Sequence, residues 1–120
     1  MTQHEIAVID NDLGVLKALN RLLTAHGFVV HVFDSAEAFL DSAAAATASC
    51  LVLDIHLDGM SGFELRRELA KAGSALPVIF MTAYDSPVTK QQALEVGCAA
   101  YLLKPFAASV LIMAIEKAVV

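Results

Sequence analysis

The chain has 120 residues and a formal net charge of −5, with 58% hydrophobic and 18% charged residues. This length fits one domain, since domains most often hold about 100–150 residues, and we expect a single domain over residues 1–120. The acidic balance argues against direct nucleic-acid binding, which needs clustered Lys and Arg. No apolar stretch approaches the roughly 20 residues that span a bilayer, and no signal peptide is visible, so we expect a cytoplasmic protein without membrane contact.

Short apolar runs alternate with amphipathic stretches along the whole chain. An apolar run bounded by turn residues is typical of a strand in a parallel sheet, which is apolar on both faces rather than alternating. Such runs predict five strands, at residues 6–9, 28–33, 50–53, 78–81 and 99–103.

The segments that follow these runs carry helix signals. They predict five helices, beginning near Leu13, Ala36, Gly62, Pro87 and Ala107. Asp12 or its neighbour is a suitable N-cap for the first of them, and Ser86 for the fourth. In the second helix we expect Phe39 and Leu40 to face inward. The small and polar residues 43–49 are expected to form its end and the connection to the third strand.

Strands that alternate with helices predict a parallel sheet with right-handed crossovers. We expect an α/β fold, a flavodoxin-like (βα)5 doubly wound five-stranded sheet with strand order 2-1-3-4-5. In that order the first and third strands are central neighbours, so Asp10 and Asp54 meet where the strand order reverses. The order is inferred from this convergence, because hydrophobic periodicity does not determine it.

Polar side chains follow the carboxyl ends of four predicted strands: Asp10 and Asn11, Asp54, Thr82, and Lys104. In a parallel sheet all four ends lie at one edge. Mg²⁺ takes oxygen ligands and keeps several waters, so Asp10, Asn11 and Asp54 could hold it. A phosphoryl group on Asp54 would then be stabilised by the metal, by the Thr82 hydroxyl and by the Lys104 ammonium.

Four motifs stand at these positions: Val8-Ile9-Asp10-Asn11-Asp12, Leu53-Asp54-Ile55-His56-Leu57-Asp58-Gly59-Met60-Ser61-Gly62, Met81-Thr82-Ala83 and Leu103-Lys104-Pro105-Phe106. With them, essentially the whole chain resembles the receiver domain of bacterial two-component response regulators. The segment Ser35-Ala36-Glu37-Ala38-Phe39-Leu40 resembles receivers of the FixJ type, which usually precede a LuxR-type helix-turn-helix domain. The chain could therefore be the N-terminal part of a longer regulator.

The resemblance implies a role for each site residue. Asp54 would accept phosphate from the phosphohistidine of a histidine kinase, and the receiver would promote the transfer with Mg²⁺. Asp10 would belong to the acidic pocket, and His56 would contribute its backbone carbonyl as a metal ligand. Such a protein is a phosphoacceptor that promotes its own phosphorylation and dephosphorylation, and is not otherwise an enzyme.

The resemblance also implies a switch that controls an output, which we expect to be transcription. Thr82 would rotate to bond the phosphoryl oxygen and would draw Tyr101 inward. Lys104 would pair with the phosphoryl group, and its peptide bond to Pro105 is expected to be cis. The family dimerises on phosphorylation through its fourth helix, fifth strand and fifth helix, and the apolar run at residues 110–115 agrees with such a surface.

Two residues depart from the family pattern. Asn11 stands where most receivers carry a second acidic, metal-binding residue. Its amide oxygen can ligate Mg²⁺ but brings no charge, so we expect weaker metal binding. Asp58 stands where Pro is common, and it adds a carboxylate near the mouth of the pocket.

Two other functions compete with the signalling switch. One is a phosphatase or phosphotransferase with an aspartyl-phosphate intermediate, but His56 stands where such enzymes carry a second Asp. The other is a pseudo-receiver, a constitutive interaction module that never takes phosphate. Asn11 favours it, whereas Asp54, Thr82 and Lys104 oppose it.

Overall fold

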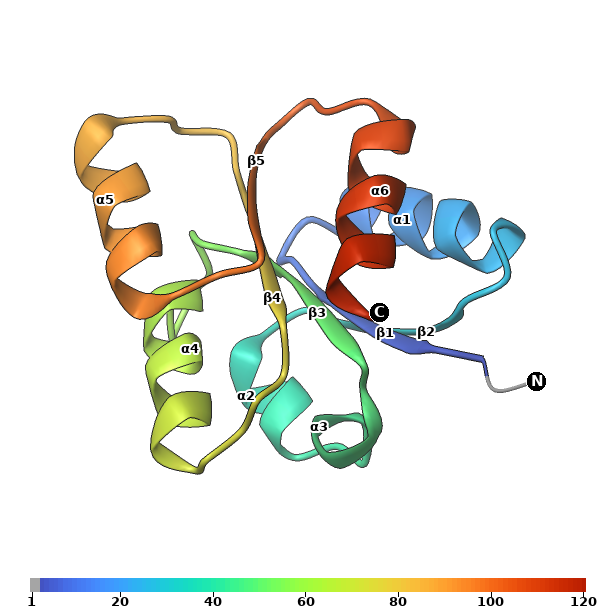
Figure 1. The fold of residues 1–120 in the computed structure, drawn as a ribbon, viewed down its shortest axis with the longest axis horizontal. Coiled ribbons are helices and arrows are strands. Elements are labelled where there is room, and N and C mark those ends of the chain that lie inside the picture. The colour runs from blue at the N-terminus through green and yellow to red at the C-terminus, as the bar shows by residue number, and fades with distance from the viewer. Residues whose placement is uncertain (1–2) are drawn as a thin grey trace.

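The computed structural model describes residues 3–120. Within them each strand is followed by one helix, except β2, which is followed by two: β1 (Glu5–Ile9), α1 (Leu13–Ala25), β2 (Val29–Phe33), α2 (Ala36–Leu40), α3 (Ala44–Thr47), β3 (Cys50–Asp54), α4 (Gly62–Lys71), β4 (Val78–Thr82), α5 (Pro87–Val96), β5 (Ala100–Leu103) and α6 (Ala108–Ala118) (Figure 1). All five predicted strands are present, with ends that agree to within one residue.

The strands form one parallel sheet in the order β2-β1-β3-β4-β5. This confirms the predicted flavodoxin-like (βα)5 arrangement. In the sheet Ile9 of β1 lies beside Leu53 of β3. The residues that follow them, Asp10 and Asp54, therefore come off neighbouring central strands at the same edge.

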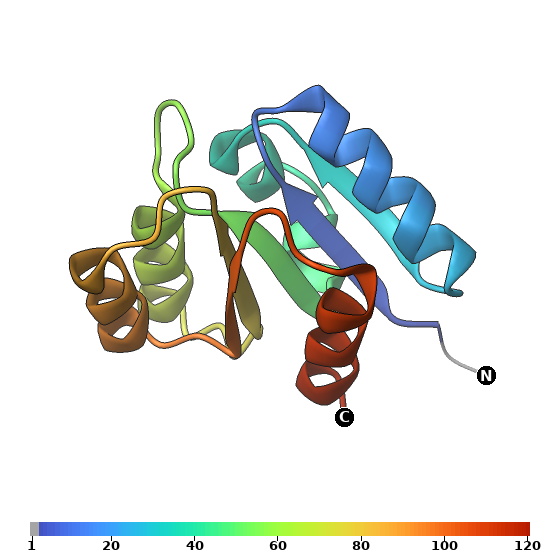
Figure 2. The same cartoon turned by 90° about the horizontal axis from the view of Figure 1, so that it is seen from above.

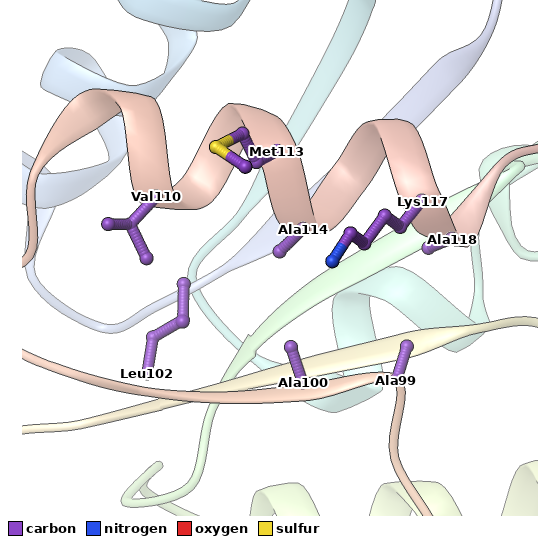
Figure 3. A pocket seen from close by; sticks show the side chains of 8 residues that line it. All are labelled: Ala99, Ala100, Leu102, Val110, Met113, Ala114, Lys117 and Ala118. Atoms are coloured by element: carbon purple, nitrogen blue, oxygen red, sulfur yellow. The ribbon is translucent and has the colours of Figure 1, made fainter.

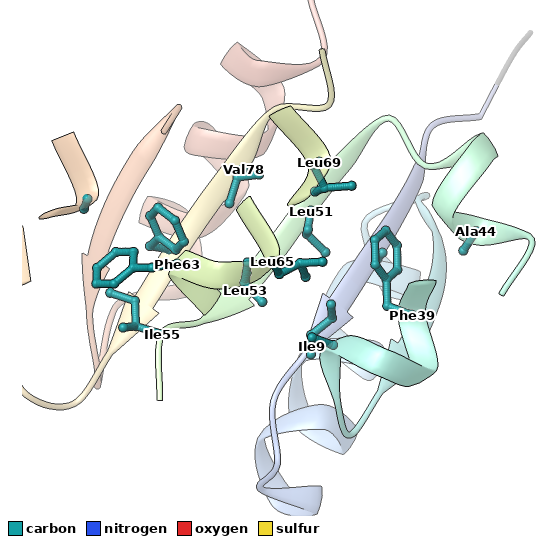
Figure 4. Close-up of a cluster of buried hydrophobic side chains, with 14 residues drawn as sticks. Ile9, Phe39, Ala44, Leu51, Leu53, Ile55, Phe63, Leu65, Leu69 and Val78 are labelled. Carbon is teal, nitrogen blue, oxygen red and sulfur yellow. The ribbon is translucent and has the colours of Figure 1, made fainter. Parts of the chain in front are cut away.

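The helices cover both faces of the sheet (Figure 2). On one face, α1 and α6 pack against buried strand side chains that include Val8, Val52 and Met81. On the other face, α2, α3, α4 and α5 pack against Ile9 and Leu53, among others (Figure 4). Because β1, β3 and β4 are buried on both faces, their sequences are continuously apolar rather than alternating.

Side-chain caps set the starts of two helices as predicted. Oδ1 of Asp12 accepts hydrogen bonds from the backbone N–H groups of Gly14 and Val15, at 2.8 and 3.3 Å. Oγ of Ser86 accepts one from the backbone N–H of Thr89, at 3.0 Å. These bonds satisfy donors that the first turn of a helix leaves without a partner.

Residues 36–49 differ from the prediction in two ways. The segment expected to be a helix end and connection contains the separate short helix α3. The preceding helix α2 ends at Leu40, and the Ser42 hydroxyl beyond it donates to the carbonyl of Phe39 at 2.7 Å. Leu40 was expected to face inward but is 37% exposed. Adjacent residues of a helix point about 100° apart, so burying Phe39 turns Leu40 outward.

No helix within the described part of the chain is long and apolar enough to cross a membrane.

Candidate functional site

The polar residues predicted to converge do lie together at the carboxyl edge of the sheet. Asp10 directly follows β1, Asp54 is the last residue of β3, Thr82 is the last of β4, and Lys104 follows β5. Among residues 3–120, the buried polar or charged residues are Asp10, Thr82 and Asp54, which are 0%, 0% and 6% exposed. Burial of a polar group is costly, so their gathering at one point marks this edge as the site.

Lys104 connects the two carboxylates. Its Nζ donates to Oδ2 of Asp10 at 2.5 Å and to Oδ2 of Asp54 at 3.3 Å. The other oxygen of each carboxylate accepts a hydrogen bond from a backbone N–H two residues further on, that of Asp12 at 2.9 Å and that of His56 at 3.0 Å. Both carboxylates are therefore held in fixed orientations.

Burial and hydrogen bonding act in opposite directions on the ionisable groups of the site. For Asp54 burial is the larger effect and raises the pKa. The His56 N–H opposes this rise, the charge of Asp10 reinforces it and Lys104 opposes it. Burial alone would lower the pKa of Lys104, but its bonds to Asp10 and Asp54 outweigh this, so that pKa lies above the ordinary value. Lys104 is thus a cation at neutral pH. The peptide bond that joins it to Pro105 is cis.

The residues at this edge supply oxygen donors suited to a small divalent cation. Within residues 3–120, His, Cys, Asp and Glu side chains nowhere gather in a group of three or more that could hold a metal ion. The groups at this edge that could hold a metal are the carboxylates of Asp10 and Asp54, the amide of Asn11 and the backbone carbonyl of His56. Asn11 and Asp12 are both exposed, and Oδ1 of Asp12 caps α1. An all-oxygen set of this size fits Mg²⁺, which keeps several of its waters.

Thr82 and Tyr101 are both bonded to the loop that follows β4. The Thr82 hydroxyl donates to the carbonyl of Tyr84 at 3.2 Å and accepts from the N–H of Tyr84 at 3.0 Å. The Tyr101 hydroxyl donates to Oδ1 of Asp85 at 3.2 Å. The side chains that were predicted to respond to a phosphoryl group are thus engaged with residues 84–85 in this structure.

Two contacts near the site were not predicted from the sequence. Glu37 of α2 accepts a hydrogen bond from the backbone N–H of Met60, in the loop after Asp54, at 3.1 Å. The exposed ring of His56 meets the edge of Tyr84, with ring centroids 5.3 Å apart. Glu37 and Met60 both lie in motifs that were recognised in the sequence. Nothing in those motifs indicated that the two residues are in contact.

Comparison with known proteins agrees with this geometry. The chain is 35% identical, over 98% of its length, to the transcriptional regulatory protein FixJ of Bradyrhizobium diazoefficiens, and covers 58% of that protein. It is 34% identical, over 94% of its length, to the response regulator protein TmoT of Ectopseudomonas mendocina, and covers 51% of that protein. The chain therefore spans little more than half the length of these relatives.

The fold has equally similar solved counterparts. The crystal structure of FixJ-N matches with a TM-score of 0.88 at 35% identity, covering 99% of this chain and 95% of that one. Residues 6–116 match the family described as the response regulator receiver domain. The chain belongs to this family, the receiver domains of two-component systems, and is similar to those of FixJ-like transcriptional regulators.

Proposed function

We propose that the chain is a phosphorylation switch in which Asp54 accepts a phosphoryl group from the phosphohistidine of a histidine kinase. The observation that carries this proposal is the gathering of Asp10, Asp54 and Thr82 as buried polar residues beside the ammonium of Lys104. This edge offers a nucleophile, a hydroxyl and a cation, which are the groups that phosphoryl transfer uses for positioning and charge neutralisation.

The transfer exchanges one bond for another. A carboxylate oxygen of Asp54 forms a P–O bond while the P–N bond of the donor breaks, and the leaving imidazole keeps the electron pair. Mg²⁺, when bound, would supply positive charge that offsets the charge of the phosphoryl group. Asp10 and Asp54 would hold the metal with the amide of Asn11 and the carbonyl of His56, and Lys104 would shift from the carboxylates to the phosphoryl group.

The response would pass through the loop after β4. For the Thr82 hydroxyl to bond the phosphoryl group, it gives up its two bonds to Tyr84. The loop that follows then moves, and the bond between Tyr101 and Asp85 opens. The loop after β4 would thus have two states, and the charge of the phosphoryl group would favour one of them.

An apolar surface on β5 and α6, within the face of α5, β5 and α6 expected to dimerise, would report this change through a phosphorylation-dependent homodimer. Val110 and Met113 of α6 are 45% and 57% exposed. They border a hollow of about 390 Å³ between β5 and α6, lined by Ala99, Ala100, Leu102, Val110, Met113, Ala114, Lys117 and Ala118 (Figure 3). A second copy would cover this apolar face. Contact with DNA would then fall to another domain, as in a transcriptional regulator.

The test is intact-mass analysis after incubation with Mg²⁺ and acetyl phosphate. We expect one phosphoryl adduct that is base-labile, absent in Asp54→Asn and absent with a chelator. Asp58→Asn is the matched control, since it removes an exposed carboxylate from the same loop, and it should be phosphorylated like the wild type. A wild type that takes no phosphate at any Mg²⁺ concentration would make the domain a pseudo-receiver.

A further inference from the structure

The loop between β3 and α4, residues 55–61, is held at its base by close backbone packing. The N–H of Gly62 donates to the carbonyl of Ile55 at 3.0 Å. A Cβ at Gly62 would lie 2.6 Å from the carbonyl oxygen of Asp54, so only glycine allows this approach. The base of the loop is thus fixed directly against the residue proposed to accept phosphate.

The tip of the same loop rests on the carboxylate of Glu37, which belongs to α2. Oε2 of Glu37 accepts a hydrogen bond from the N–H of Met60 at 3.1 Å. The neighbouring Gly59 has a φ of +73°, and a Cβ there would lie 2.7 Å from the same oxygen. The loop backbone therefore packs straight onto this carboxylate, and two segments that are 23 residues apart are joined.

Capping of α2 does not account for this contact. The N-cap of α2 is Ser35, whose Oγ accepts from the N–H of Ala38 at 3.1 Å. The Glu37 carboxylate points instead to another element, and it bonds a donor of the loop that carries the carbonyl of His56. Fixing a short loop at its base and at a second point reduces the conformational freedom that is lost when a backbone carbonyl of that loop binds a ligand.

We propose that Glu37 is a positioning residue of the phosphoacceptor site, which holds the loop after Asp54 so that its backbone is already placed for Mg²⁺. The inference rests on the proposed function. Glu37 itself touches neither the metal nor the phosphoryl group. It acts through its hydrogen bond to Met60, so an amide that can still accept this bond should serve nearly as well as the carboxylate.

The experiment compares wild type with Glu37→Ala, Glu37→Gln and Asp41→Ala. The Asp41→Ala control removes one exposed carboxylate of the same charge from the end of the same helix. Mg²⁺ affinity is measured by calorimetry, and phosphorylation by acetyl phosphate is followed as a function of Mg²⁺. Hydrogen exchange of the Met60 amide, followed by NMR without metal, reports the tether itself.

We expect Glu37→Ala to raise the Mg²⁺ Kd about fivefold, as the loss of one charge-assisted hydrogen bond implies, and to speed exchange at Met60 by a similar factor. The half-saturating Mg²⁺ concentration should rise while the phosphorylation rate at saturating Mg²⁺ stays unchanged. Glu37→Gln and Asp41→Ala should remain within about twofold of wild type.

The inference is overturned if Glu37→Ala and Asp41→Ala shift the Mg²⁺ affinity equally, because the effect is then one of net charge. It is also overturned if Glu37→Gln loses as much Mg²⁺ affinity as Glu37→Ala. The same holds if the wild type binds Mg²⁺ and takes phosphate but Glu37→Ala has the same Mg²⁺ affinity as the wild type. A wild type that does neither overturns the proposed function instead, and that outcome is visible without any Glu37 variant.

Discussion

The Nζ of Lys104 lies 2.5 Å from Oδ2 of Asp10, a carboxylate whose residue is fully buried, and this ion pair joins the ends of β1 and β5. The Lys104 side chain is 20% exposed, so the pair is only partly screened by water. The same ammonium also forms an ion pair with Asp54. One cation therefore offsets the charge of two buried acids.

Lys104→Ala should leave both carboxylates without their counter-charge. Removing one partner of a largely buried pair is strongly destabilising, and we expect a loss of about 2 kcal/mol in the free energy of unfolding without metal. Excess Mg²⁺ should recover part of it. Urea denaturation with and without Mg²⁺ measures both effects. Lys17→Ala, at an exposed position on α1, should change stability by less than about 0.5 kcal/mol. Equal stability of the two variants would contradict the expectation.

Asp54→Asn should stabilise the metal-free protein in a pH-dependent way. Burial raises the pKa of Asp54 above 3.8 in the folded state. The folded protein thus prefers the protonated form, and wild-type stability falls as pH rises from about 3.8 through the folded pKa. The amide of Asn is uncharged, so its burial does not lower the stability as pH rises. The variant should therefore unfold at higher urea concentration than wild type at pH 7, with a smaller gain at pH 4. A gain of the same size at both values would show that burial of the charge is not its cause.

Asn11→Asp should tighten Mg²⁺ binding. Asn11 is exposed beside Asp10, and it carries a neutral amide where a second carboxylate could bind the metal. A carboxylate at position 11 would add both an oxygen ligand and a negative charge, so we expect the Kd to fall about tenfold. Calorimetry measures it. Asn20→Asp adds the same charge on the exposed surface of α1 and should leave the Kd nearly unchanged. Equal affinities for Asn11→Asp and wild type would show that this residue is not a ligand.

Met113→Lys should block the phosphorylation-dependent dimer. Met113 is 57% exposed on α6, and a lysine there would place a cation in the apolar contact with the second copy. After treatment with acetyl phosphate and Mg²⁺, light scattering should find a dimer for wild type and a monomer for the variant, with equal phosphorylation of both. Leu40→Lys, at a 37% exposed apolar position on α2, should still dimerise. If phosphorylated Met113→Lys forms the same dimer, the interface lies elsewhere.

The sequence was sufficient for the parts of the site that follow from strand order. Once five apolar runs are assigned to a parallel sheet, the residues after them must share one edge. The strand order 2-1-3-4-5, which was chosen because it brings Asp10 and Asp54 together, then places them on neighbouring strands. Caps such as Asp12 and Ser86 were readable because their side chains bond backbone only two or three residues away. These features depend on local chemistry and on one topological choice.

Other features depend on distances that no local pattern contains. The alanine-rich stretch that forms α3 has the same helix propensity whether it extends α2 or forms a separate helix, so propensity did not predict the break between them. The contact between Glu37 and Met60 needs the orientation of α2, the length of the loop and the positive φ of Gly59 together. The bond between Tyr101 and Asp85 likewise joins two elements whose distance is set by packing.

The strand order also has a consequence for synthesis on the ribosome. After β3 pairs with β1, β4 pairs with β3 and β5 with β4, so the sheet grows at a single edge in the order in which the strands are made. No pair already formed has to open for a later strand to enter. Lys104 arrives last, beside the outermost strand, β5. The strand that is made last therefore delivers the cation that pairs with Asp10 and Asp54 at the ends of the two central strands.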